Sequence, residues 1–224
     1  DVTQTGITTN KSEEINELLE QMKYPFYYLD YETYPTAVPI YEGCRPYMQI
    51  PFQYSLHIQR EPGGEYEHKE FLADAGDTNP MKPLTEALKE VIGDEGSIVV
   101  WNKKFESKCH EYIGEVYPEY SELMESLNER VFDLMEIFQK NLYVHKDFKG
   151  KYSIKKVLPV LDPDLSYEGL NISDGSMAMN SWKKMVFETA SEAEKEKIRK
   201  DLLEYCKLDT WGMVRIYEFL KNLG

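Results

Sequence analysis

Two acidic residues lie on a short segment that is otherwise rich in aromatic side chains. Residues 27–33 have the sequence YYLDYET, which predicts a strand because aromatic residues fit a pleated, half-buried surface. Side chains alternate between the two faces of a strand, so Asp30 and Glu32 are expected side by side on one face. Two carboxylates this close repel each other, and oxygen ligands of this kind suit a hard divalent cation such as Mg²⁺ or Mn²⁺.

An Asp-x-Glu pair alone is explained more simply as the solvated edge of a sheet. Two later segments supply further acids. Glu106 lies in the first turn of a predicted helix, where the helix dipole by itself favours an acid. Tyr205 and Asp209 are four residues apart on the last predicted helix and therefore share one face, although singly they suit a core tyrosine and a solvated acid. Together the three segments favour a metal-dependent active site.

The elements that must position these residues alternate between strands and helices. A strand at 52–58, a Pro-Gly-Gly turn and a returning strand at 66–73 predict a hairpin, so the first three strands form an antiparallel meander. The apolar run 97–102 predicts a central strand buried on both faces, reached by a parallel crossover. Helices are expected at 80–92, 105–116, 119–127, 131–142 and 176–187, and a last one capped by Ser191. The fold class predicted is α/β, a mixed sheet flanked by helices.

We expect a single domain over residues 1–224, with an N-terminal extension and helix at 1–24 and a core at 25–224. Residues 1–9 are polar and are expected to be loose, and Asn10 begins a capping-box spacing for the first helix. The proline-rich stretch 34–51 predicts a long irregular loop beside the acids. The chain begins without methionine, so we expect it to be a fragment of a longer protein.

The composition excludes some classes of protein. A formal charge of −14 argues against a protein that coats duplex DNA, but not against a nuclease whose carboxylates are loaded with divalent ions. Cys44, Cys109 and Cys206 have no metal-ligand spacing, and an odd, scattered set fits a reducing cytoplasm. The sequence has no long apolar run and no signal-peptide pattern, so no membrane segment is expected.

One segment is basic. Between residues 143 and 156 the cations are interrupted by aromatic Phe148 and Tyr152, a combination that suits a single nucleic-acid strand, with lysines at phosphates and a ring stacked on a base. A solvated loop explains the segment equally well. The candidate substrate-binding lysines are Lys149, Lys151 and Lys155.

In the order and spacing of its acidic motifs and of Tyr205, the chain resembles the DEDD superfamily of 3′→5′ exonucleases. The resemblance is to the tyrosine-bearing branch, whose fold is ribonuclease H-like. The resemblance covers residues 26 to 213. The matching positions are Asp30 and Glu32 for the first motif, Asn102, Phe105 and Glu106 for the second, and Tyr205 and Asp209 for the third. Glu106 departs from the pattern, because the superfamily usually has Asp there. The combination looks most like an uncharacterised bacterial domain family found near the C-terminus of longer proteins, which often carry a RecB-like nuclease region.

The resemblance implies hydrolysis of phosphodiester bonds in single-stranded DNA or RNA with two Mg²⁺ or Mn²⁺ ions. The metal ligands would be Asp30, Glu32, Glu106 and Asp209, and Tyr205 would orient the attacking water. Asn102 and Phe105 would contact the terminal nucleotide. A cytoplasmic bacterial enzyme is expected.

Several alternatives stay open from the sequence alone. Asp133 is a reserve candidate for the fourth acid, although a structural role in the helix predicted around it is the preferred interpretation. The domain could retain the fold but serve as a nucleic-acid-binding or protein-interaction module with little or no turnover. Endonucleolytic cutting is a third possibility, because a fold by itself does not define an activity.

Overall fold

The computed structural model describes residues 6–74, 79–188 and 190–223. Its centre is a five-stranded mixed sheet with the order β4-β3-β2-β5-β6. The strands are β2 (Phe26–Thr33), β3 (Pro51–Gln59), β4 (Tyr66–Leu72), β5 (Ser97–Val100) and β6 (Val131–Asp133). β2, β3 and β4 run antiparallel to one another, whereas β5 is parallel to β2 and β6 is parallel to β5. The predicted meander followed by parallel strands is confirmed.

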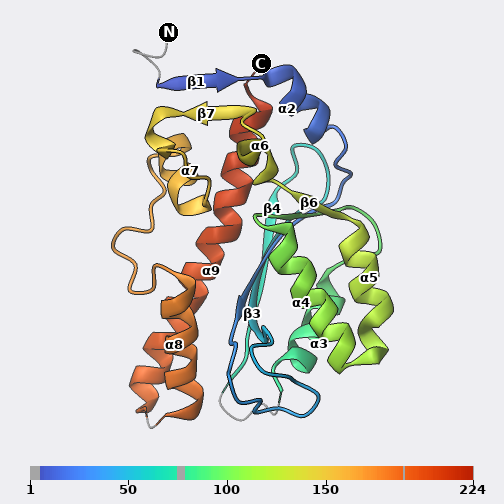
Figure 1. Cartoon of the computed structure of the whole chain (residues 1–224), viewed down its shortest axis with the longest axis vertical. Coiled ribbons are helices and arrows are strands. Elements are labelled where there is room, and N and C mark those ends of the chain that lie inside the picture. The colour runs from blue at the N-terminus through green and yellow to red at the C-terminus, as the bar shows by residue number, and fades with distance from the viewer. Residues whose placement is uncertain (1–5, 75–78, 189, 224) are drawn as a thin grey trace.

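Helices cover both faces of the sheet (Figure 1). On one side lie α3 (Met81–Val91), α4 (Lys103–Val116) and α5 (Ser121–Glu129). On the other side the long helix α9 (Glu192–Lys221) crosses the sheet, with α7 (Ile154–Leu161) and α8 (Gly175–Phe187) beside it. Each side has its own apolar core, because alternate residues of the central strands point to opposite faces. Tyr28 packs under α9, for example, while Tyr27 and Leu29 face α3 and α4.

The last helix begins where the sequence indicates. The Ser191 hydroxyl accepts from the Glu194 backbone N–H, and the Glu194 carboxylate accepts from the Ser191 backbone N–H, which completes a capping box. Leu202, Met213 and Ile216 of this helix are fully buried in the apolar core on this side of the sheet. Thirty residues in one helix place both ends of the sheet within reach of α9.

The N-terminal segment differs from the prediction. Part of the stretch expected to be loose forms β1 (Ile7–Asn10), which pairs antiparallel with β7 (Tyr143–His145) in a separate two-stranded sheet. Asn10 therefore ends a strand and caps no helix, and α2 (Ser12–Leu19) begins two residues later without a side-chain cap. Ile15 of α2 is fully buried in the core under α9. Residues 1–5 lie outside the described part of the chain.

Residues 131–142 also differ. The predicted helix is replaced by β6 at the sheet edge, the short helix α6 (Glu136–Gln139) and a turn in which Asn141 has a φ of 54°. The apolar residues at the start of this stretch fit both the helical and the strand periodicity. The stretch forms a strand because Val131 pairs with Ile98 of β5. Within the described residues, no helix combines the length and apolar character needed to cross a membrane.

Candidate metal centre

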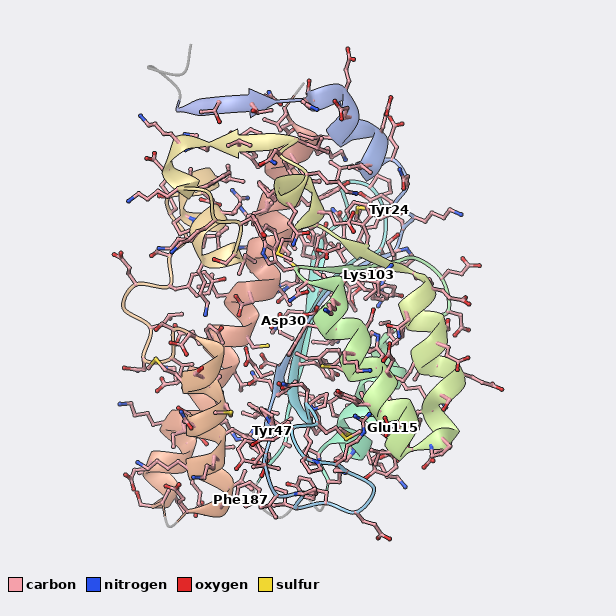
Figure 2. All side chains as sticks on the ribbon, viewed as in Figure 1. Tyr24, Asp30, Tyr47, Lys103, Glu115 and Phe187 are labelled. Carbon is pink, nitrogen blue, oxygen red and sulfur yellow. The ribbon has the colours of Figure 1, made fainter. Side chains whose placement is uncertain are left out.

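The acidic pair of β2 faces α9, as the alternation along the strand predicts. Asp30 lies between α9 and α4 (Figure 2), and Glu32 follows on the same face. Cys206 of α9 joins them: its Sγ lies 3.5 Å from Asp30 Oδ2. One ligand atom from each of Asp30, Glu32 and Cys206 lies within 4.8 Å of the other two. A strand and a helix distant in sequence thus bring three potential metal ligands together.

Electrostatic strain accompanies this arrangement. Burial, followed by the charge of Asp209, raises the pKa of Asp30 well above its ordinary value. Burial, followed by the charges of Asp30 and Asp209, raises the pKa of Glu32 in the same way. Lys155 opposes both shifts with its positive charge. One lysine does not neutralise three carboxylates, so the pocket favours an additional cation.

Glu106 contributes a fourth carboxylate from the first turn of α4. It is only 2% exposed, and no hydrogen-bond partner reaches its Oε2 atom from the described residues. Burial and then the charge of Asp30 raise the pKa of Glu106 well above its ordinary value, with smaller contributions from Asp133 and Glu32. An exposed acid at a helix N-terminus would need no further explanation, but a buried oxygen without a donor does.

Asp209 is held by a tyrosine. The Tyr167 hydroxyl donates to Asp209 Oδ1 over 2.5 Å. Burial raises the pKa of Asp209 to about 6, against the Tyr167 hydrogen bond, the charge of Lys155 and a hydrogen bond from Tyr205, all of which lower it. Tyr167 comes from the connection between α7 and α8, and it orients a candidate metal ligand from outside the ligand set.

Tyr205 lies one turn before Asp209 on α9 and is 4% exposed. Lys155 Nζ donates to its hydroxyl over 2.8 Å and lies 4.7 Å from the centre of its ring. Burial and the nearby Asp209, Glu32 and Asp30 raise the pKa of the Tyr205 phenol, so the hydroxyl stays protonated. It is therefore suited to orienting a water molecule by hydrogen bonds and unsuited to removing a proton as a phenolate.

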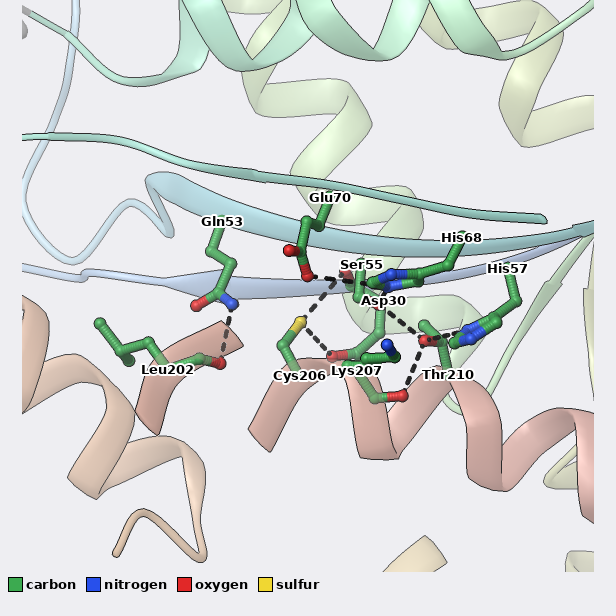
Figure 3. A network of polar contacts seen from close by, with 10 residues as sticks. All are labelled: Asp30, Gln53, Ser55, His57, His68, Glu70, Leu202, Cys206, Lys207 and Thr210. Atoms are coloured by element: carbon green, nitrogen blue, oxygen red, sulfur yellow. Dashed lines mark hydrogen bonds and ion pairs between the residues drawn. The ribbon is translucent and has the colours of Figure 1, made fainter. Parts of the chain in front are cut away.

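A polar network holds α9 in register over the sheet (Figure 3). Gln53 Nε2 donates to the Leu202 carbonyl over 2.8 Å. Two turns further along, Thr210 Oγ1 lies 2.7 Å from Ser55 Oγ and 2.8 Å from His57 Nδ1. These contacts lie on both sides of the turn that carries Cys206 and Asp209, and they fix its position relative to β2.

A cavity of about 490 Å³ opens beside the acids. It is lined by Glu32 and Phe105 together with Asp174 and Gly175 at the start of α8. A side chain added at Gly175 would come within 3.7 Å of Glu32 Oε2, so the helix start lies close to the carboxylate. The cavity places the half-buried ring of Phe105 next to a candidate metal ligand, in a position to contact a bound nucleotide.

Asn102 and Asp133 lie near the start of α4 but outside the cluster of buried carboxylates. Asn102 precedes α4, is exposed, and its side chain makes no capping hydrogen bond. Asp133 ends β6, where its carboxylate accepts from the backbone N–H groups of Lys103 and Met135. Asp133 is thus a structural acid at a strand end, and the helix predicted around it is absent.

The basic segment divides into parts with different environments. Lys155 points into the acidic cluster, whereas Lys149 and Lys151 are exposed on the connection to α7. Phe148 is 4% exposed and packs in the core, which removes it as a stacking residue, while Tyr152 is 45% exposed. Trp101 Nε1 donates to the Tyr152 carbonyl, so this segment lies against the end of β5.

Sequence reasoning missed Tyr167, Cys206 and Thr210 as members of the site. Cys206 adjoins the predicted Tyr205, but three scattered cysteines carry no ligand spacing. Tyr167 lies 42 residues before its partner Asp209 in a turn-rich stretch, without a local signal. The four carboxylates, rich in oxygen and poor in donors, fit a hard divalent cation, and the unpaired Glu106 oxygen supports that fit.

Comparison with known protein families places the chain in one of them. Residues 27–153, more than half of its length, match the family described as a domain of unknown function, DUF2779. The chain belongs to the DUF2779 family. The matched range contains Asp30, Glu32 and Glu106, and the expectation of an uncharacterised family is confirmed.

Curated relatives come from bacteria. The chain is 27% identical over 228 residues to the uncharacterized protein UU173 of Ureaplasma parvum, covering 92% of this chain and 33% of that protein. It is also 27% identical over 233 residues to the MG366 homolog of Mycoplasma pneumoniae, covering 95% and 34%. The chain therefore spans about a third of these relatives. No solved structure matches it.

Proposed function

We propose that this domain is a divalent-metal-dependent 3′→5′ exonuclease acting on single-stranded DNA or RNA. One observation carries the proposal: buried carboxylates from β2, α4 and α9 lie close enough for their charges to act on one another, with Lys155 and the Tyr205 hydroxyl beside them. The three sequence segments that supply them are those that resemble the tyrosine-bearing DEDD exonucleases. The mixed sheet, an antiparallel meander followed by parallel strands, agrees with the ribonuclease H-like fold that the resemblance implies.

The residues of the site have different roles in the proposed reaction. Asp30, Glu32 and Asp209 would hold one cation, and Glu106 with Asp30 a second. When bound, such ions activate water and neutralise charge on the scissile phosphate. Tyr205, kept protonated by its surroundings, orients the attacking water by hydrogen bonding. Tyr167 holds Asp209 in place.

Lys155 and Phe105 would meet the substrate. The Lys155 ammonium donates to the Tyr205 hydroxyl, and its charge acts on Asp30, Glu32 and Asp209. It is therefore positioned to contact a phosphate oxygen of the substrate. Phe105 lines the cavity beside Glu32, where a terminal base or sugar would pack against its ring.

The decisive experiment uses 5′-labelled single-stranded DNA and RNA of equal sequence. We expect Mn²⁺ or Mg²⁺ to produce a descending ladder of products, abolished by chelator and by Asp30→Ala. Glu125→Gln on α5 is a matched control, because Glu125 is an exposed acid on the far side of α4, and it should leave the ladder unchanged.

The pattern of products separates the alternatives. Internal fragments without a ladder would indicate endonucleolytic cutting. Binding of both strands without cleavage by either metal would overturn the enzyme proposal in favour of a nucleic-acid-binding module.

A further inference from the structure

Cys206 is an unusual neighbour for a site expected to hold hard cations. Its thiol is fully buried and lies 3.5 Å from Asp30 Oδ2 and 3.8 Å from the Asp30 carbonyl oxygen. Magnesium sites use oxygen ligands, whereas a sulfur ligand draws softer ions such as Zn²⁺ and Cd²⁺. The cluster of Asp30, Glu32 and Cys206 is therefore a mixed sulfur and oxygen donor set.

The thiol is held toward the acids by its helix. Leu202, Cys206 and Thr210 are spaced four residues apart and lie on one face of α9. Gln53 anchors the first through its carbonyl, and Ser55 anchors the third through its hydroxyl (Figure 3). Rotation of α9 that would withdraw the thiol from Asp30 would break both contacts, so the donor set is preorganised.

A second observation indicates that the cluster is short of a positive charge. Glu106 Oε2 is buried and has no hydrogen-bond partner among the described residues, and the charge of Asp30 acts on the Glu106 carboxylate. Glu106 thus adds a negative charge that acts on Asp30 and Glu32, with no donor among the described residues for one of its oxygens. A cation bound to the thiolate and carboxylates would satisfy this oxygen directly or through water.

We propose that Asp30, Glu32 and Cys206 form a binding site for a borderline or soft divalent cation, of which Zn²⁺ and Cd²⁺ are the representatives. Coordination replaces the S–H bond by a metal–sulfur bond, and the thiol proton passes to solvent. Such an ion occupies the position needed by a hard cation and inhibits turnover. The inhibition rests on the proposed nuclease activity, whereas the binding does not.

The test titrates the whole chain with Cd²⁺ and follows the ultraviolet charge-transfer band of a cadmium thiolate, with proton release measured in parallel. We expect the band to saturate at one equivalent and to disappear in Cys206→Ser. Cys44→Ser is the matched control, because Cys44 lies outside the cluster, and it should keep the band. Asp30→Asn retains the thiol and should weaken Cd²⁺ binding at least about tenfold, as losing a neighbouring ligand does.

A wild-type protein without the band, or a Cys206→Ser protein that keeps it, would overturn the proposal. Circular dichroism checks the fold of each variant, and Cys206→Ala replaces Cys206→Ser if the serine protein is unfolded. If a nuclease ladder is obtained, Zn²⁺ should suppress it in wild type and at least about tenfold less effectively in Cys206→Ser. A cadmium band without any ladder would support this site while refuting the exonuclease proposal, and a ladder without the band would do the reverse.

Discussion

Two polar clusters lie under α9 on the same face of the sheet, and their chemistry is opposite. In the cluster formed by Gln53, Ser55, His57, His68 and Thr210, most polar groups pair with a neighbour: Thr210 contacts Ser55 and His57, and Ser55 Oγ lies 2.9 Å from His68 Nε2. Gln53 Nε2 donates to the Leu202 carbonyl, although the buried Gln53 Oε1 has no partner among the described residues. In the neighbouring acidic cluster, acceptors gather with few donors, and burial raises every carboxylate pKa. Both clusters use α9, and the strands β2 and β3 that carry their main residues are adjacent in the sheet, so the clusters differ mainly in the chemistry of their side chains.

Buried polar groups that pair with each other specify a packing, while buried charges without partners lower stability unless something else binds. The first cluster explains how α9 is positioned. The second explains why that position matters, because the same helix turn brings Cys206 and Asp209 to Asp30. We therefore predict that removing one charged or polar group has opposite effects on the stability of the metal-free protein in the two clusters. The change should stabilise the fold in the acidic cluster and destabilise it in the paired cluster.

The largest effect is expected at Glu106. Glu106→Gln retains the size of the side chain but removes its charge, and it should reduce nuclease turnover at least about a hundredfold, the scale of losing one group that stabilises charge at a reaction centre. The same change relieves repulsion with Asp30, so thermal unfolding without metal should occur at a higher temperature at pH 8.

Thr210→Val is the contrasting variant for that measurement. It removes a hydroxyl that Ser55 and His57 both contact, and it should lower the free energy of unfolding by about 1–3 kcal/mol, the range for leaving buried polar groups unpaired. Stabilisation by Thr210→Val, or destabilisation by Glu106→Gln, would show that the two clusters do not differ in the way described.

A smaller effect is expected at Tyr167, where a donor enters the acidic cluster. Tyr167→Phe keeps the ring that packs beside Tyr205 and removes the hydrogen bond to Asp209. Mn²⁺ affinity, measured by calorimetry, should fall about 10–100-fold, as is usual when a group that orients a metal ligand is lost. The exposed Tyr47 provides the control variant, Tyr47→Phe. Equal affinities in both variants would mean that Asp209 needs no help from Tyr167.

The sequence predicts the residues of the acidic cluster better than it predicts the polar network that positions α9 over the sheet. Asp30 and Glu32 share a face because of strand alternation, and Tyr205 and Asp209 share one because of helical spacing; both inferences are local. Thr210 and Ser55 are 155 residues apart, and nothing near either residue indicates the contact. The strand at 131–133 was missed for the same reason, since its pairing with β5 outweighs a local pattern that also suits a helix.

The last expected effect is a dependence of stability on pH, which arises in the paired cluster. Burial, then the charges of His68 and Lys207, lower the pKa of His57 to about 3, and burial followed by the charge of Lys207 lowers that of His68 to about 4. A histidine with a lowered folded-state pKa binds its proton more readily in the unfolded chain. Its contribution to stability is therefore complete above the unfolded pKa of about 6.5 and is lost as the pH falls toward the folded value.

Wild type should lose stability relative to His57→Gln between about pH 6.5 and 4, by at most about 1.4 kcal/mol per pH unit for one proton. Urea unfolding of both proteins at several pH values gives this difference directly. Other titrating groups, including the buried His110, whose pKa burial lowers to about 4, are common to both chains and cancel. Parallel stability curves would mean that His57 is not held neutral by the network, and the contrast with the acidic cluster would then rest on Thr210 and Ser55 alone.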